Sequence, residues 1–482
     1  MKHLLITTAV LTSASLLVGL AANIAANPAE PSPMASRVAP SSETPIVFEA
    51  DSGEKVDAFE GTFTVPENRA DPDSRKLTIH YVRFPATTDA PGAPIVYLAG
   101  GPGGSGIGTA RRQRFALFMA LRQYGDVIAY DQRGTGRSND MQTCTRPGLG
   151  LSAVISDEEA LAGELSALAA CMDEWEAAGI DISGYDTVEN ARDLDDLRRH
   201  LDAEKLSLWG ISYGSHLGLA AMRELDGRID RAVFASIEGL EQTVKLPART
   251  DAYFDRLQTA MNALDPETPD IKALIARVHA DFDAAPKTLD VEGKRVVYHR
   301  RDMQSMLGQA ISDPQWAIFM VGVYQDLDQG DVGSLETLLA RWELTSDHSF
   351  SPMSRLTDIA SGTDAARRRL IDAQASRSLV GSNLNASYHY EDIQPDLVLG
   401  SDFREAVESD IPVLLLSGTL DGRTYPEAAR EAMAGLTNAH HVLIENAGHN
   451  LFMTDPEIGR IIERFMAGET DLPGRISVEI PD

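Results

Sequence analysis

Basic residues, cysteines and aromatic residues are scarce in this chain of 482 residues. Lys and Arg number 43 against 72 Asp and Glu, which gives a net charge of -29, and no Lys/Arg cluster is evident. Because such clusters make the contacts with nucleic acids and anionic membranes, the composition argues against both as partners. The acidity is explained by solubility, with attraction of a cationic substrate as the alternative. A composition of 43% hydrophobic and 6% aromatic residues is typical of a soluble globular protein.

The N-terminus has the layout of an export signal. Met1-Lys2-His3 gives a positive start, 4–22 is apolar, and Ala25-Ala26 supplies small residues. This order predicts a signal peptide at 1–26, with an uncleaved anchor as the alternative. The Pro- and Ser-rich stretch 27–45 predicts a flexible linker. We therefore expect a periplasmic or secreted protein with no membrane contact beyond this signal.

Cysteine is limited to Cys144 and Cys171. In an exported protein such a pair is expected to oxidise, and the disulfide would hold the segment that comes after the predicted strand at 126–130. Two buried free thiols are the alternative.

Apolar runs predict the strands. Two alternating segments, 59–65 and 76–82, are typical of partly solvated strands. Continuous runs typical of buried strands come next, at 94–98, 126–130, 206–209, 231–235, 411–416 and 441–444. Helical patterns separate several of them, notably 187–201 and 216–225. This alternation predicts an α/β fold with a mostly parallel sheet and helices on both faces.

The alternation of buried strands and helices stops over 242–397, where helical patterns replace buried strands. The helical candidates are 250–264, 270–284, 303–310 and 335–342. We predict a mainly helical cap inserted over the carboxyl ends of the strands, where open α/β sheets bind ligands. The expected organisation is a core at 46–241 and 398–482 that is interrupted by this cap.

A glycine loop, Gly101-Pro102-Gly103-Gly104-Ser105-Gly106, comes after the strand at 94–98. It satisfies G-x-G-x-x-G, and Asp131 stands at the end of the next strand, so a nucleotide-binding protein is one alternative. Pro102 removes an amide from the phosphate cradle, which weakens that hypothesis. The competing interpretation is that the glycine amides point at a carbonyl oxygen.

A second glycine motif, Gly210-Ile211-Ser212-Tyr213-Gly214, stands between an apolar run and a helical pattern. This G-x-S-x-G context predicts a nucleophile elbow, a sharp turn that exposes the Ser212 hydroxyl. The pattern is short enough to occur by chance, so its weight depends on whether suitable partner residues occur later in the chain.

Two such residues come later, in the order that a Ser-Asp-His triad on this kind of sheet requires. Asp421 comes just after the strand at 411–416, and His449 comes after the strand at 441–444. Asp421 could instead begin a turn with Gly422, and a lone histidine is often structural. Their joint order favours Ser212 as nucleophile, His449 as base and Asp421 as the group that orients His449. The amides of Gly101 and Tyr213 would then hold the oxyanion, and neither metal nor cofactor is required.

With these residues placed, the sequence resembles the α/β-hydrolase family of prolyl iminopeptidases and secreted tripeptidyl aminopeptidases. The resemblance rests on the glycine loop from Gly100 to Gly106, the run Asp131-Gln132-Arg133-Gly134-Thr135-Gly136-Arg137-Ser138, the elbow and Gly448-His449. It covers roughly 61–237 and 411–465. It implies an α/β-hydrolase fold and removal of one or a few residues from peptide N-termini, without metal or cofactor, beneath a cap.

The sequence departs from this family at informative positions. Ala99 stands where prolyl iminopeptidases usually have histidine, and Tyr213 where their elbow has tryptophan, so the chain is closer to the tripeptidyl branch. That branch often carries a Cys-x-Glu-Asp-like element, whose nearest match here is His389-Tyr390-Glu391-Asp392.

An aminopeptidase also needs a carboxylate for the substrate's α-ammonium group. The resemblance makes Glu391, with Asp392, one candidate; Glu238, just beyond a strand end, is another. All could equally be solvated acids. Arg133 and Arg137 are expected to brace loops by pairing with acids.

The leading hypothesis is an exported serine aminopeptidase acting on a peptide or small acyl substrate. An esterase or lactonase is the alternative on the same fold, because the triad does not distinguish ester from amide cleavage. A non-catalytic binding protein is disfavoured because every triad position is filled.

Overall fold

A ten-stranded sheet forms the centre of the structure. This computed structural model describes residues 43–480 except 113, 140, 343 and 382. The expected signal peptide at 1–26, and the expected linker as far as residue 42, lie outside the described residues. The first strand begins at Thr44, so the last two residues of the expected linker belong to the sheet.

The sheet has an antiparallel edge and a parallel body. Its order is β1-β2-β3-β5-β4-β7-β8-β12-β13-β14. Neighbours from β1 to β5 pair antiparallel, and neighbours from β5 to β14 pair parallel. The predicted mostly parallel sheet is confirmed, and each predicted buried run overlaps a strand. The strands are β1 (Thr44–Glu49), β2 (Lys55–Pro66), β3 (Lys76–Phe84), β4 (Ile95–Leu98), β5 (Val127–Tyr130), β6 (Cys144–Arg146), β7 (Leu206–Ser212), β8 (Ile229–Ile237), β9 (Lys287–Val291), β10 (Lys294–Tyr298), β11 (His348–Phe350), β12 (Val413–Gly418), β13 (Ala439–Glu445) and β14 (Arg475–Ser477).

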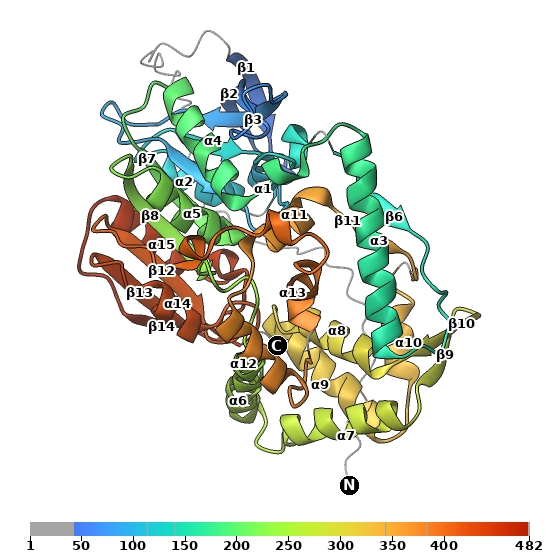
Figure 1. Cartoon of the computed structure of the whole chain (residues 1–482). Coiled ribbons are helices and arrows are strands. Elements are labelled where there is room, and N and C mark those ends of the chain that lie inside the picture. The colour runs from blue at the N-terminus through green and yellow to red at the C-terminus, as the bar shows by residue number, and fades with distance from the viewer. Residues whose placement is uncertain (1–42, 113, 140, 343, 382, 481–482) are drawn as a thin grey trace. The chain divides into compact units, whose positions relative to one another are not determined.

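Helices cover both faces of the sheet because the central strands are apolar on both sides. All four residues of β4 and of β5 are buried. Helices α1, α2 and α15 pack in one hydrophobic cluster, and α4, α5 and α14 pack in the other. The α-helices (Figure 1) are α1 (Gly106–Arg111), α2 (Phe115–Leu121), α3 (Asp157–Ala177), α4 (Thr187–His200), α5 (Tyr213–Glu224), α6 (Pro247–Leu264), α7 (Ile271–Ala284), α8 (Arg300–Ala310), α9 (Pro314–Asp328), α10 (Gly333–Leu339), α11 (Pro352–Ser361), α12 (Ala365–Ala375), α13 (Ala386–Tyr390), α14 (Pro426–Ala432) and α15 (Pro456–Met466). Short 3₁₀ turns are η1 (Gly136–Ser138), η2 (Ile182–Gly184), η3 (Asn383–Asn385), η4 (Pro395–Leu397), η5 (Ser401–Arg404) and η6 (Leu451–Met453).

The segment between β8 and β12 is mostly helical, as predicted, and carries α6 to α13. Much of it packs around a hydrophobic cluster of its own, which includes Tyr253, Leu274 and Met320. It also contains strands that the sequence patterns do not predict: an antiparallel β9–β10 hairpin, and β11, which pairs with β6 from the first part of the chain. The expected boundaries at 242 and 397 stay predictions.

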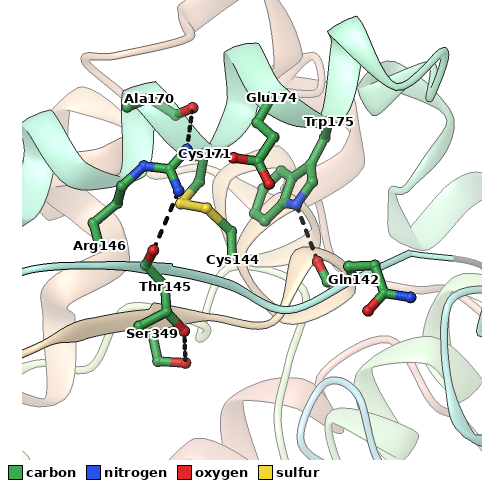
Figure 2. Close-up of a disulfide and its surroundings, with 9 residues drawn as sticks. All are labelled: Gln142, Cys144, Thr145, Arg146, Ala170, Cys171, Glu174, Trp175 and Ser349. Carbon is green, nitrogen blue, oxygen red and sulfur yellow. Dashed lines mark hydrogen bonds and ion pairs between the residues drawn. A yellow bond between two sulfur atoms is a disulfide. The ribbon is translucent and has the colours of Figure 1, made fainter.

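A disulfide joins β6 to α3 (Figure 2). Cys144 and Cys171 are bonded, with their Cα atoms 5.7 Å apart, which confirms the expected pairing. Beside it, Arg146 pairs with Glu174 at 2.5 Å and Trp175 donates to the Gln142 carbonyl at 3.2 Å. Because β6 also pairs with β11, the disulfide connects the long helix α3 to a strand of the insertion.

Candidate active site

Ser212 occupies a strained turn between β7 and α5. Its φ of 57° and ψ of -131° are rarely adopted by a residue with a side chain. The turn brings backbone close on both sides: a Cβ at Gly210 would lie 2.6 Å from the Gly214 carbonyl oxygen, and one at Gly214 would lie 2.0 Å from that of Leu98. Only glycine fits these two positions. Ser212 makes no capping hydrogen bond with its side chain, so its hydroxyl is not used by α5.

The glycine loop after β4 lies against this turn. A Cβ at Gly100 would lie 2.8 Å from the Ile211 carbonyl oxygen and 3.0 Å from the Ser212 Cβ. Gly101 has a φ of 132°, which favours glycine. On the other side of Ser212, Tyr213 is the first residue of α5, where backbone amides lack partners within the helix. Amides of Gly101 and Tyr213 are thereby available on the two segments that flank Ser212.

Asp131 holds the glycine loop in place. Its carboxylate accepts hydrogen bonds from the Ser105 hydroxyl at 2.7 Å and from the amides of Ile107 at 3.0 Å and Arg137 at 2.8 Å. Ribose binding in a dinucleotide fold needs such a carboxylate to be free. Here the protein itself uses Asp131, so the G-x-G-x-x-G spacing has a structural explanation.

The neighbours of Asp131 brace the same region. Gln132 donates to the Ala99 carbonyl at 2.9 Å. The fully buried Arg133 donates two hydrogen bonds to Asp193, at 2.6 and 2.7 Å, and Arg137 pairs with Glu60. The expectation that both arginines brace loops by pairing with acids is confirmed.

Asp421 and His449 meet at the carboxyl ends of β12 and β13. The Asp421 Oδ2 lies 2.9 Å from the His449 Nδ1 and accepts from the Thr424 hydroxyl at 2.6 Å. Its Oδ1 accepts from the amides of Arg423 and Thr424 at 2.8 and 2.9 Å. Burial by itself raises the pKa of Asp421, but the charge of His449 and these hydrogen bonds hold that pKa below its usual value. A buried carboxylate therefore faces one ring nitrogen of His449.

The His449 loop is fixed on both sides. The His449 amide donates to the Ser312 carbonyl at 2.8 Å, and the Ser236 hydroxyl donates to the His449 carbonyl at 2.7 Å. Ser312 belongs to the insertion between β8 and β12, so this insertion contacts the histidine directly.

Ser212 and His449 line one cavity of about 430 Å³ together with Gly100 and Gly101. The predicted triad residues and the predicted glycine loop thus converge, since Asp421 contacts His449. A pocket of this size suits a small ligand or a short segment of peptide.

The three candidate acids for a substrate amine have different surroundings. Glu238 lines the cavity and is buried. Glu391 and Asp392 do not line it: Glu391 accepts from the Thr363 hydroxyl at 2.7 Å, and the exposed Asp392 pairs with Arg368 at 3.0 Å. The structure brings only Glu238 to Ser212.

Glu238 forms a buried ion pair with a lysine that sequence patterns do not identify. The Lys245 Nζ lies 2.6 Å from Glu238 Oε2 and 2.7 Å from the Gln242 carbonyl oxygen. Burial raises the pKa of Glu238, but the charge and hydrogen bond of Lys245, together with the charges of His216 and His449, outweigh it and leave that pKa below its usual value. Among the described residues, Glu238 Oε1 has no hydrogen-bond partner. One carboxylate oxygen therefore remains available in the cavity that Ser212 lines.

Other charged residues in or near this cavity are also not identified from the sequence patterns. Arg114 and Arg423 line the cavity. Asp358, on α11, has its pKa raised to about 7 by burial, against the opposing charge of Arg355, and the charges of Glu238, Lys245 and Arg423 also act on it. Arg423 stands two residues after Asp421, the predicted triad acid. This closeness in sequence is the one feature that could have predicted the place of Arg423 in the cavity. Arg114 and Asp358 come from segments whose approach to the site depends on the folded chain.

The described part of the chain shows neither a metal cluster nor a membrane span. It contains no group of three or more His, Cys, Asp or Glu placed to hold a metal ion. None of its helices is both long and apolar enough to span a bilayer.

Several known proteins are similar to this chain in sequence or in structure. The serine protease Hip1 of Mycobacterium tuberculosis is 28% identical over 184 residues, 35% of this chain and 34% of that protein. The tripeptidyl aminopeptidase of Streptomyces lividans is 30% identical over 188 residues, 37% of this chain and 35% of that protein. The alignments thus span about a third of the length of these relatives. A solved structure of MGS-M2, an α/β hydrolase enzyme from a deep-sea metagenome library, aligns at 16% identity with a TM-score of 0.38, over 82% of this chain and 96% of its own.

A family match covers most of the chain. Residues 93–456 match the family described as alpha/beta hydrolase fold. The strand order, the elbow at Ser212 and the predicted resemblance all agree with that match. This chain belongs to the α/β hydrolase fold family.

Proposed function

We propose that this protein is a serine aminopeptidase that releases one or a few residues from the N-termini of peptides. The observation that carries the proposal is the cavity in which Ser212 and His449 lie beside a buried carboxylate with a free oxygen, Glu238 Oε1. The similarity to a protein named tripeptidyl aminopeptidase supports the same choice.

In the proposed acylation step, His449 Nε2 takes the proton of the Ser212 hydroxyl while Oγ attacks the carbonyl carbon of the scissile amide. The Asp421 Oδ2 accepts from Nδ1 at 2.9 Å, which fixes the tautomer that leaves Nε2 basic. The amides of Gly101 and Tyr213 stabilise the negative oxygen that forms.

In the later steps, the tetrahedral intermediate collapses and His449 returns its proton to the departing nitrogen. Water then attacks the acyl-enzyme with His449 again as base, which frees the N-terminal fragment and restores Ser212. The proton that leaves serine in the first step ends on the released amine, so the cycle balances without a cofactor.

Glu238 would select for a free N-terminus. An α-ammonium group that leaves water needs a compensating charge, and Glu238 Oε1 supplies an acceptor on a carboxylate held by Lys245. Glu391 and Asp392 are not proposed for this role, because neither lines the cavity.

We also propose that the protein is exported. The disulfide between Cys144 and Cys171 favours an oxidising compartment, and the N-terminal pattern 1–26 has the order of a signal peptide.

The test compares matched substrates on purified protein. Free-N-terminal alanyl and tripeptidyl nitroanilides should be hydrolysed, their N-acetylated versions should not, and Ser212→Ala should be inactive on all of them. Glu238→Gln should lower kcat/KM for free-amine substrates at least tenfold, whereas Glu391→Gln is the matched control and should not. Turnover of nitrophenyl esters alone would instead identify an esterase.

A further inference from the structure

Arg423 presents an unpaired charge to the cavity that holds Ser212. Its backbone amide donates to Asp421 Oδ1 at 2.8 Å, which fixes the start of the side chain next to the proposed triad. The side chain is half-buried and lines the cavity. In the part of the chain that the structure describes, its guanidinium has neither a carboxylate within 4.0 Å nor a hydrogen-bond acceptor.

Arg114 is a second guanidinium in the same cavity without a carboxylate partner. It donates to the Tyr97 hydroxyl and to Asn450 Oδ1, both neutral groups. Its guanidinium carbon lies 5.4 Å from the centre of the Phe452 ring, which holds the side chain in place. Among the described residues no carboxylate oxygen lies within ion-pair distance of it.

The cavity lining is therefore positive, although the chain carries a net charge of -29. Arg114, Lys245 and Arg423 line it together with Glu238, and only Lys245 is paired with that carboxylate. A guanidinium partly withdrawn from water is stabilised most by a carboxylate, which accepts two parallel hydrogen bonds from it.

Both arginines flank His449. Arg423 lies on the loop whose Asp421 contacts His449 Nδ1, and Arg114 contacts Asn450, the next residue after His449. In serine hydrolysis the histidine must reach the nitrogen that departs. Since both arginines line the same cavity as Ser212 and His449, we place the released part of the substrate beside these two guanidinium groups.

We infer that Arg423 and Arg114 bind a carboxylate on the released part of the substrate, and that the preferred substrates are short peptides with a free C-terminal carboxylate or an acidic residue just after the cleaved bond. The inference rests on the proposed peptidase function and names its substrate class. It assigns two specificity-determining residues that are distinct from the triad and from Glu238.

The test varies substrate charge and arginine charge together. Tetra-alanine with a free C-terminus and its C-terminal amide are compared by kcat/KM, with the released products identified by mass. The wild type should favour the free acid about tenfold or more, as expected for a charge-assisted contact. Arg423→Gln and Arg114→Gln should each reduce this ratio severalfold, and Arg114→Lys should restore part of it.

The control is an arginine outside the cavity. Arg430→Gln alters an exposed arginine of α14 that does not line the cavity, and it should keep the wild-type ratio. A ratio near one in the wild type, or a ratio unchanged in both cavity variants, would overturn the inference. So would a preference confined to peptides with the acidic residue before the cleaved bond.

An ester pair separates this inference from the peptidase proposal. Acetyl esters of 4-hydroxybenzoate and of its methyl ester place a carboxylate, or none, on the leaving group. If no peptide is cleaved but the carboxylate ester is favoured in the wild type and not in Arg423→Gln, the peptidase proposal fails and the carboxylate site stands. If esters are cleaved without that dependence, the carboxylate site fails.

Discussion

Asp421 is the residue on which the geometry of His449 depends. Four donors satisfy its two oxygens: two amides, the Thr424 hydroxyl and the His449 ring. Because the side chain is fully buried, each donor is worth more than it would be in water. The carboxylate therefore has one orientation and remains ionised, as its lowered pKa indicates.

Replacing this carboxylate by an amide tests that role. Asp421→Asn keeps the size of the side chain but can donate a proton toward Nδ1, which favours the wrong tautomer of His449. We expect kcat to fall by about 10⁴, with a much smaller change in KM. Steady-state hydrolysis of the preferred substrate measures this.

Thr424→Val is the companion of Asp421→Asn, because it removes one donor to Asp421 and leaves the carboxylate in place. It should lower kcat far less. Equal losses in the two variants would contradict the tautomer argument and indicate general disruption of the loop.

At the scale of elements, the sequence predicts the strands that are buried on both faces and misses the elements that depend on partners. The runs at β4 and β5 are apolar throughout and only four residues long, and that length favours a buried strand over a helix, which makes them predictable. β11 has three residues and exists only because β6 pairs with it. Helix α3 escapes prediction because its buried positions, such as Leu168 and Trp175, are confined to its second half.

The residues of the candidate site also fall into two groups, those that the sequence predicts and those that depend on packing. Ser212, Asp421 and His449 stand at strand ends, so their order along the chain predicts their meeting. Arg114, at the start of α2, lines the cavity, and Asp358 of α11 is close enough for the charges of Glu238, Lys245 and Arg423 to act on it; no local pattern predicts the packing that places either residue. Glu238 is a candidate from the sequence, but its pairing with Lys245, seven residues later, requires the turn that joins β8 to α6.

The packing of α7 against α9 contains a titratable contact. His279 Nε2 lies 2.7 Å from the Tyr324 hydroxyl, and the His279 residue as a whole is 4% exposed. Burial lowers the pKa of His279 to about 4, and the charge of Arg300 contributes to the same shift. The neutral ring is thus the form that the folded helices accept.

This contact predicts a loss of stability in acid. A histidine whose pKa is depressed by folding contributes stability above its unfolded pKa near 6.5, and that contribution disappears as the pH falls toward 4. The full effect is on the order of 3 kcal/mol. Urea unfolding midpoints at pH 7.5 and 4.5 should therefore move less in His279→Gln than in the wild type, and His348→Gln, a half-exposed histidine, should behave as the wild type does. Equal acid shifts in all three proteins would refute the assignment.

At the scale of the whole molecule, two electrostatic effects of opposite sign act on a substrate. The net charge of -29 repels anions at long range, whereas Arg114 and Arg423 attract a carboxylate at contact. The composition by itself leaves a cationic substrate open as an alternative. The charges that line the cavity favour a substrate with a carboxylate. The net charge of the molecule therefore governs the approach of such a substrate, whereas the charges of the cavity govern its binding.

A change of ionic strength distinguishes the long-range repulsion from the attraction at contact. The Debye length falls from about 30 Å at 0.01 M salt to about 8 Å at 0.15 M, which screens the long-range repulsion more than a contact inside a cavity. Added salt should therefore raise kcat/KM for a peptide with a net negative charge severalfold and leave a peptide of no net charge, such as tetra-alanine with both termini free, almost unchanged. Stopped assays at low substrate concentration between these two salt levels measure the difference. If kcat/KM for the anionic peptide instead falls as salt rises, the local guanidinium groups dominate at every distance, and the acidic surface has no influence on how substrate reaches Ser212.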